Sequence, residues 1–166
     1  MHRRLLGAVE SISGITLHDL YEAYPDFDID IRREQQLLLE HDVLVVQCPF
    51  YWYSVPPLVK QWEDLVLEHG WAYGREGKAL VGKSWLQMVS AGGGANAYSA
   101  EGRNRMTVEA LLAPLENTAR LCNMQWLAPH VVHGTHAMTA ADFDREAARY
   151  VERLRRIGDE HRLVNA

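Results

Sequence analysis

The sequence has only two cysteines, Cys48 and Cys122, and they do not form a CxxC pair. This scarcity argues against a disulfide-stabilised secreted scaffold and favours the cytoplasm, with a single disulfide left open. No apolar run has the length needed to cross a bilayer, and no basic–apolar–small signal pattern opens the chain. An excess of positive charge is also missing. The net charge is −5, so the composition gives no case for a nucleic-acid partner.

What remains is the profile of one globular domain over residues 1–166, with 48% hydrophobic residues and no internal repeat. Four segments are predicted as strands: 14–20, 42–48, 83–91 and 124–134. Helical patterns cover 30–41, 56–70, 107–122 and 139–157, the third with Pro114 inside it. Asp28 or Asp30 is expected to cap the first of these, and Thr139 with Asp142 resembles a capping box. The alternation predicts an α/β fold with a mostly parallel sheet.

Two loops follow predicted strands and carry unusual side chains. "PFYWYS" places four aromatic rings in a row, Phe50 to Tyr53, and "SAGGGANAYS" contains three glycines, Gly92 to Gly94. In open parallel sheets, ligands bind beyond the carboxyl ends of the strands. Glycines allow close backbone approach and positive φ, and rings favour flat ligands. The pair predicts a slot for a planar ligand; alternatively, the aromatic rings anchor a dimer, and both can hold together.

The stretches "HDLYEAYPDFDIDIRREQ", "QCPFYWYSVPPLVKQWEDLVL", "HGWAYG", "SAGGGANAYS" and "MQWLAP" occur in this order. Together they resemble the NAD(P)H:quinone oxidoreductase branch of the flavodoxin-like fold, in particular the ancillary flavoproteins of glutathione-regulated potassium-efflux systems. The resemblance implies a three-layer α/β/α domain that binds FMN, or FAD as in some relatives. It further implies NAD(P)H as electron donor, a quinone as acceptor and a homodimer. Such a dimer would dock on the cytosolic domain of a potassium-efflux transporter, at the inner face of the membrane.

The resemblance also assigns roles to residues. Its flavin-binding positions are Phe50, Tyr51, Trp52 and Tyr53 along the isoalloxazine, and Ser90, Ala91, Gly92 and Gly93 at its pyrimidine edge. Tyr98 matches a tyrosine that assists charge relay, and its usual histidine partner, six residues on, is Asn104 here. Since asparagine does not take up a proton near neutral pH, turnover through it is expected to be weak. Trp71 and Tyr73 match residues that wall the substrate pocket from the partner subunit.

One part of the family pattern is not found at the front of the chain. "MHRRLLGAVESISGITLHDL" reads as the first helix followed directly by the second strand, so the first strand and the phosphate loop are expected to be lacking. Either the natural protein starts upstream of Met1, or the chain is truly shorter and binds flavin poorly. The second explanation leads to the alternative function, a catalytically weak or inactive regulatory subunit without bound flavin.

Three closely spaced histidines are candidate metal ligands. His130, His133 and His136 recur every three residues near the end of the last predicted strand. A solvated or hydrogen-bonded set is the more common meaning of such spacing in a loop, and no cysteine accompanies it. We therefore expect no metal site.

Overall fold

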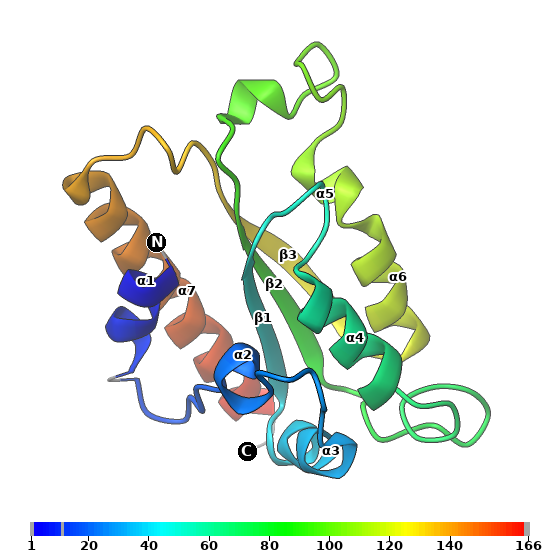
Figure 1. The fold of residues 1–166 in the computed structure, drawn as a ribbon. Coiled ribbons are helices and arrows are strands. Elements are labelled where there is room, and N and C mark those ends of the chain that lie inside the picture. Colours follow the sequence, from blue (N-terminus) through cyan, green and yellow to red (C-terminus); the bar gives the residue numbers. More distant parts are fainter. Residues whose placement is uncertain (1, 11, 165–166) are drawn as a thin grey trace.

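Three parallel strands form the centre of the computed structural model, which describes residues 2–10 and 12–164 (Figure 1). They are β1 (Val43–Pro49), β2 (Ser84–Ser90) and β3 (Gln125–Val132), in the order β1-β2-β3. Every residue of β2 is buried, as expected for the middle strand of a sheet covered on both faces. The predicted parallel sheet is confirmed.

Helices cover both faces of the sheet, so the three-layer α/β/α architecture is also confirmed (Figure 1). One face carries α1 (His2–Val9) and α7 (Ala140–Val164). The other carries α3 (Ile31–Glu40), α4 (Pro57–Val66) and α6 (Ala113–Leu121). The short elements are α2 (Leu20–Ala23), the 3-10 turn η1 (Ala95–Ala97) and α5 (Val108–Leu111).

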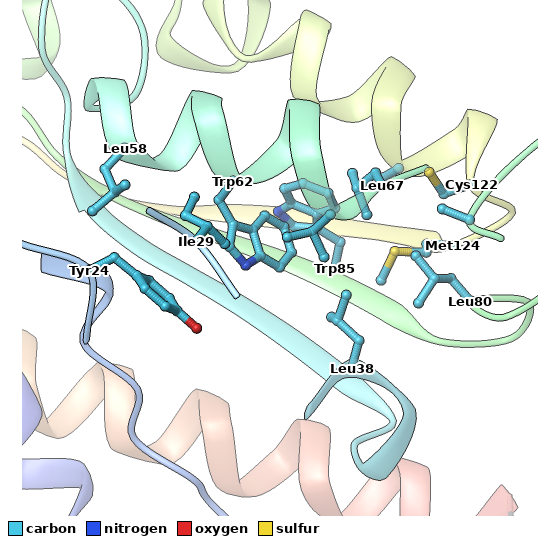
Figure 2. Packing of buried hydrophobic residues seen from close by; sticks show 13 residues of the cluster. Tyr24, Ile29, Leu38, Leu58, Trp62, Leu67, Leu80, Trp85, Cys122 and Met124 are labelled. Carbon is cyan, nitrogen blue, oxygen red and sulfur yellow. The ribbon is translucent and has the colours of Figure 1, made fainter. Parts of the chain in front are cut away.

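Alternation along the strands sends buried side chains to both faces of the sheet. Leu86 and Met88 of β2 pack with Leu5 of α1 and Tyr150 of α7. Trp85, which points the other way, packs with side chains of α3, α4 and the end of α6 (Figure 2). This is the period of two that a strand between two helical layers requires.

Helix ends follow the expected capping chemistry. The Asp30 carboxylate accepts the Arg33 N–H at 3.0 Å. The Thr139 N–H donates to Asp142 at 2.7 Å, and the Asp142 N–H donates back to the Thr139 hydroxyl, as in a capping box. The predicted helix over 107–122 is divided at Leu112 into α5 and α6, and Pro114 lies in the first turn of α6, where no N–H is needed. Within the described residues, no helix has the apolar length to cross a membrane.

The predicted strand over 14–20 is wrong. Residues 15–19 have no regular structure, and Asp19 caps α2 by accepting the N–H groups of Tyr21 and Glu22. A strand needs a neighbour for its backbone groups, and no described strand lies beside this segment. The free edge of β1 likewise has no strand partner in the described part of the chain. The three-stranded sheet matches the expectation that the family's first strand is not in this sequence.

A buried carboxylate, Glu34 of α3, ties the segment before α3 to the core. It accepts hydrogen bonds from the Tyr24 hydroxyl at 2.6 Å and the Trp62 indole N–H at 2.8 Å, and pairs with His18 at 2.8 Å. Burial would raise the Glu34 pKa, but these hydrogen bonds outweigh it and hold the pKa below its ordinary value. One buried carboxylate therefore holds the segment 18–24 against the core.

Candidate functional site

The loops that follow the three strands meet at one edge of the sheet, because parallel strands end on the same side (Figure 1). Backbone hydrogen bonds continue the sheet into these loops. The Phe50 N–H donates to the Ser90 carbonyl at 2.9 Å, and the Ala91 N–H donates to the Val132 carbonyl at 2.8 Å. The structure thus brings together the aromatic and glycine segments that the sequence placed at strand ends; we call this edge the rim.

The aromatic segment turns sharply at the rim. Tyr51 and Ser54 exchange both backbone hydrogen bonds, at 3.0 and 2.9 Å, around the central residues Trp52 and Tyr53. Their φ values are +49° and +66°, the left-handed region that a two-residue type I′ hairpin loop requires and that Asn-Gly usually fills. Trp52 is 93% exposed, so the strained backbone presents a large ring to solvent.

The four rings do not form one continuous wall. Phe50 is buried in the core beneath the rim, where it meets the Tyr98 ring edge-on at 6.1 Å. Tyr51, Trp52 and Tyr53 are exposed. Three rings are therefore free to meet a ligand or a partner, while the first supports the site from below.

The glycine segment, Gly92 to Gly94, lies close to neighbouring side chains at its first two positions. A Cβ on Gly92 would lie 2.3 Å from His136 Nε2, and one on Gly93 would lie 3.2 Å from Tyr98 Cε2. The positive φ considered for these glycines is not found; the nearby positive-φ residue is Gly134, whose N–H donates to the Gly93 carbonyl at 2.9 Å. Within the described residues, the N–H groups of Gly92, Gly93 and Gly94 have no hydrogen-bond acceptor. These amides are available to hydrogen-bond an acceptor-rich ligand that approaches the rim.

Tyr98 and Asn104 lie near the rim but do not pair with each other in the way the family pattern suggests. The half-buried Tyr98 ring packs between Phe50 and His133. Asn104 accepts a hydrogen bond from the Tyr53 hydroxyl at 3.2 Å, and its N–H donates to the Ala97 carbonyl at 2.9 Å. Asn104 therefore braces the aromatic turn against the glycine segment.

Three histidines lie beside the segment 90–94, and none of them was expected there from the sequence. His136 lies against Gly92, and the His133 ring is 5.5 Å from that of Tyr98. His2 Nε2 bonds to the Ser90 hydroxyl at 2.7 Å. Burial lowers the His2 pKa to about 4, so His2 is neutral at pH 7. Position at the carboxyl end of a predicted parallel strand drew attention to the loop 90–99, and the same rule could have selected His133 and His136; nothing local points to His2.

These histidines do not form a metal set. His130 is buried in β3 beside Tyr150, with ring centroids 5.0 Å apart, while His133 and His136 face Tyr98 and Gly92. The described residues contain no group of three histidine, cysteine or acidic side chains arranged to hold a metal ion.

Trp71 and Tyr73 lie away from the rim within one chain. They belong to the segment 67–83, which joins α4 to β2 and therefore lies at the amino edge of the sheet (Figure 1). Both rings are partly buried against the core. Tyr73 also lines a cavity of about 280 Å³ between α4 and α6, and Ser54 of the aromatic turn lines the same cavity.

Glu63 is the unusual side chain in the lining of this cavity. It is 7% exposed, and its Oε1 has no hydrogen-bond partner in the described structure. Burial raises its pKa to about 7. The cavity therefore contains a carboxyl group that changes charge near neutral pH.

The fold and the rim define a flavodoxin-like protein, and a family model described as "Flavodoxin-like fold" matches residues 1–154. The chain belongs to this family. Among its relatives, the glutathione-regulated potassium-efflux system ancillary protein KefG of Pectobacterium atrosepticum is 44% identical over 153 residues, which are 92% of this chain and 84% of that protein.

Solved structures agree on the fold. General stress protein 14 from Treponema denticola, in complex with FMN, is 41% identical with a TM-score of 0.87, covering 92% of this chain and 88% of that one. An NADPH-quinone reductase from P. pentosaceus is 32% identical with a TM-score of 0.83, covering 91% and 86%. A protein reported as a thermophilic tryptophan halogenase from Streptomycin violaceusniger is 42% identical with a TM-score of 0.89, covering 91% and 88%. Because these names differ in activity, the likeness establishes family and fold, and the reaction must be argued from the site.

Proposed function

We propose that this chain is an FMN-dependent NAD(P)H:quinone oxidoreductase that serves as the ancillary subunit of a glutathione-regulated potassium-efflux system. One observation carries the proposal: three amide N–H groups, at Gly92 to Gly94, have no acceptor among residues 2–10 and 12–164 and share a rim with an exposed aromatic turn. The pyrimidine edge of FMN is rich in acceptors and its ring system is flat, so the cofactor fits both features. FMN in the relative from T. denticola and the name of the P. pentosaceus reductase support the choice.

In this proposal the bound flavin supplies two-electron transfer between nicotinamide and quinone. The chain's own residues bind and orient the cofactor and exclude water from it. The amides of the glycine segment would hold the pyrimidine edge, and Tyr51, Trp52 and Tyr53 would cover the ring. Phe50, from below, keeps Tyr98 in place at the rim.

The proposed homodimer is supported by the cavity between α4 and α6. Ser54 lies at its rim end, and Tyr73 belongs to the segment at the amino edge of the sheet. A two-fold axis that pairs this face with its own copy would bring the 71–73 segment of one subunit to the aromatic turn of the other. Leu121, 59% exposed at the end of α6, would then become buried.

The experiment is purification of the protein followed by three measurements: its flavin absorbance, bleaching of that absorbance by NADPH or NADH under nitrogen, and its mass by light scattering. We expect a yellow dimer whose colour is bleached by a nicotinamide and restored by a quinone. A Leu121→Glu variant should shift the mass toward the monomer, whereas Glu116→Gln, in the same helix but outside the cavity lining, should not. A colourless protein that FMN cannot reconstitute would refute the enzymatic proposal.

A second candidate is a regulatory subunit without flavin, docked on the cytosolic domain of a potassium-efflux transporter. It is favoured by Asn104, which cannot relay a proton, and by the likeness to KefG. A colourless dimer that binds the purified cytosolic domain of such a transporter would support it. A yellow, active dimer that also binds this domain would unite the two functions.

A further inference from the structure

The cavity between α4 and α6 contains a carboxyl oxygen that nothing satisfies. Glu63 of α4 lines this cavity of about 280 Å³ and is 7% exposed, and its Oε1 has no hydrogen-bond partner among residues 2–10 and 12–164. Apolar side chains, among them Leu67, Leu112 and Leu115, make up most of the lining around it. A buried polar atom without a partner is rare, so this carboxyl group calls for a partner or for the loss of its charge.

The cation and the hydroxyl group nearest to Glu63 are engaged elsewhere. Lys60 bonds to the carboxylate of Asp64 one turn further along α4, and both of these side chains are exposed. The Thr118 hydroxyl, which lines the cavity from α6, donates to the Pro114 carbonyl at 3.0 Å. Since Lys60 and Asp64 balance each other, the charged residues of the lining sum to zero only when Glu63 holds a proton.

The other titratable groups around Glu63 bring no positive charge. Burial, with the Glu63 charge as a smaller cause, raises the pKa of the Cys122 thiol to about 11 and that of Cys48 to about 12, so both are neutral. Tyr73, from the segment 67–83, contributes a phenol ring to the lining. Glu34 of the neighbouring α3 is an acid, and its own charge is held by three donors.

We propose that a second copy of this chain closes the cavity over a protonated Glu63, so that dimer formation takes up a proton at each chain. The inference rests on the homodimer of the proposed function, whose contact face includes this cavity. In an isologous contact the same patch meets itself, so among the described lining residues the partner brings another Lys60–Asp64 pair and no spare cation. An ionised Glu63 would then be a buried charge without compensation, which is strongly unfavourable.

The direction of the pH dependence follows from burial. In one chain, burial already raises the pKa of Glu63 to about 7, and a second copy that excludes the remaining water raises it further. The dimer therefore holds more protons than two separate chains do. Its affinity is highest below pH 7 and falls as pH rises above that value. Uptake of one full proton per chain would change the dimer Kd by about 100-fold per pH unit, so about tenfold or more is expected between pH 6.5 and 8.5.

The test is the dimer Kd of the purified protein, measured by sedimentation equilibrium at pH 6.5 and pH 8.5 at constant ionic strength. The parent Kd should rise about tenfold or more at pH 8.5. Glu63→Gln, which keeps the size of the neutral acid, should retain the tight value at both pH values. Glu109→Gln, at an exposed position of α5 outside the cavity lining, should behave like the parent. Calorimetric dilution in two buffers of different ionisation enthalpy should show proton release on dissociation of the parent and none for Glu63→Gln.

The possible results separate the inference from the proposed homodimer. An equal Kd at both pH values, or a parental pH dependence in Glu63→Gln, overturns the inference and leaves the homodimer standing. A dimer that tightens as pH rises also overturns it, because the carboxylate would then have a cation from the partner. Monomers at both pH values refute the homodimer and the inference together, while the flavin absorbance still decides the enzymatic proposal. If the dimer is too tight to dissociate on dilution, Leu121→Ala weakens the contact, and the same comparison is made in that background.

Discussion

Replacement of Trp52 by asparagine should make the protein more stable and a poorer flavin binder. Trp52 has φ of +49°, and its side chain is 93% exposed. A left-handed backbone costs an ordinary L-residue about 1–2 kcal/mol, and asparagine bears this cost more easily because its short side chain bonds locally. Little burial is lost with a ring that contacts mostly solvent. The net gain is about 1 kcal/mol, or a Tm higher by about 2–4 °C for a domain of this size.

The same change removes a ring that we place over the cofactor. A lost aromatic contact is worth about 0.5–1.5 kcal/mol, which corresponds to FMN binding weakened by about 2- to 12-fold. Stability is measured by urea unfolding of the flavin-free protein, and affinity by fluorescence titration with FMN. Tyr21→Asn is the control, because Tyr21 is an exposed aromatic residue in α2 without positive φ. Destabilisation by Trp52→Asn, or FMN affinity equal to that of the parent, would contradict the reasoning.

Three further predictions concern Glu63, Gly93 and Glu34. The Glu63 pKa is raised to about 7 from an ordinary 4.5. The free energy of unfolding therefore falls by about 3 kcal/mol as pH rises through this range. Urea unfolding of Glu63→Gln should lack that slope and show higher stability at pH 8, unlike the exposed control Glu109→Gln; a parental slope would mean that Glu63 has a partner. Gly93→Val should lower flavin occupancy after dialysis, because its side chain meets Tyr98 and fills the rim; occupancy equal to the parent's would exclude the glycine segment as a flavin edge. Glu34→Gln should cost about 2–4 kcal/mol at pH 7 and less as pH falls through the carboxyl pKa, since three donors lose a charged acceptor; thermal unfolding at pH 7 and pH 3 measures both.

Much of the architecture could be predicted because it depends on local patterns. The apolar run of β1 and the capping box at Thr139 are local signals, and both are confirmed. The meeting of the two rim loops also followed, since parallel strands must end on one side. The segment 14–20 failed for the opposite reason: its pattern suits a strand, but pairing depends on a neighbour that no local pattern reveals.

The candidate site was only partly accessible to such reasoning. Its loops were found, yet the close approach at Gly92 depends on His136, which lies far along the chain. The left-handed backbone at Trp52 and Tyr53 was not foreseeable, because the sequence there lacks the Asn-Gly that normally marks such a turn. The sequence placed His133 only in a solvated or hydrogen-bonded set of histidines, with a metal site as the less common alternative. Its contact with Tyr98 arises from the order of strands in the sheet, which spacing along the chain does not express.

The Glu34 network bears on how "HDLYEAYPDFDIDIRRE" should be understood. Part of that stretch is fixed to the core by hydrogen bonds from His18 and Tyr24 to the Glu34 carboxylate. A transporter approaching this side would instead touch Leu17 and Tyr21, whose side chains are 42% and 46% exposed. Residues that distinguish a subgroup in this stretch can therefore serve the packing of the domain itself. Recognition of a membrane partner would depend on the exposed residues between them.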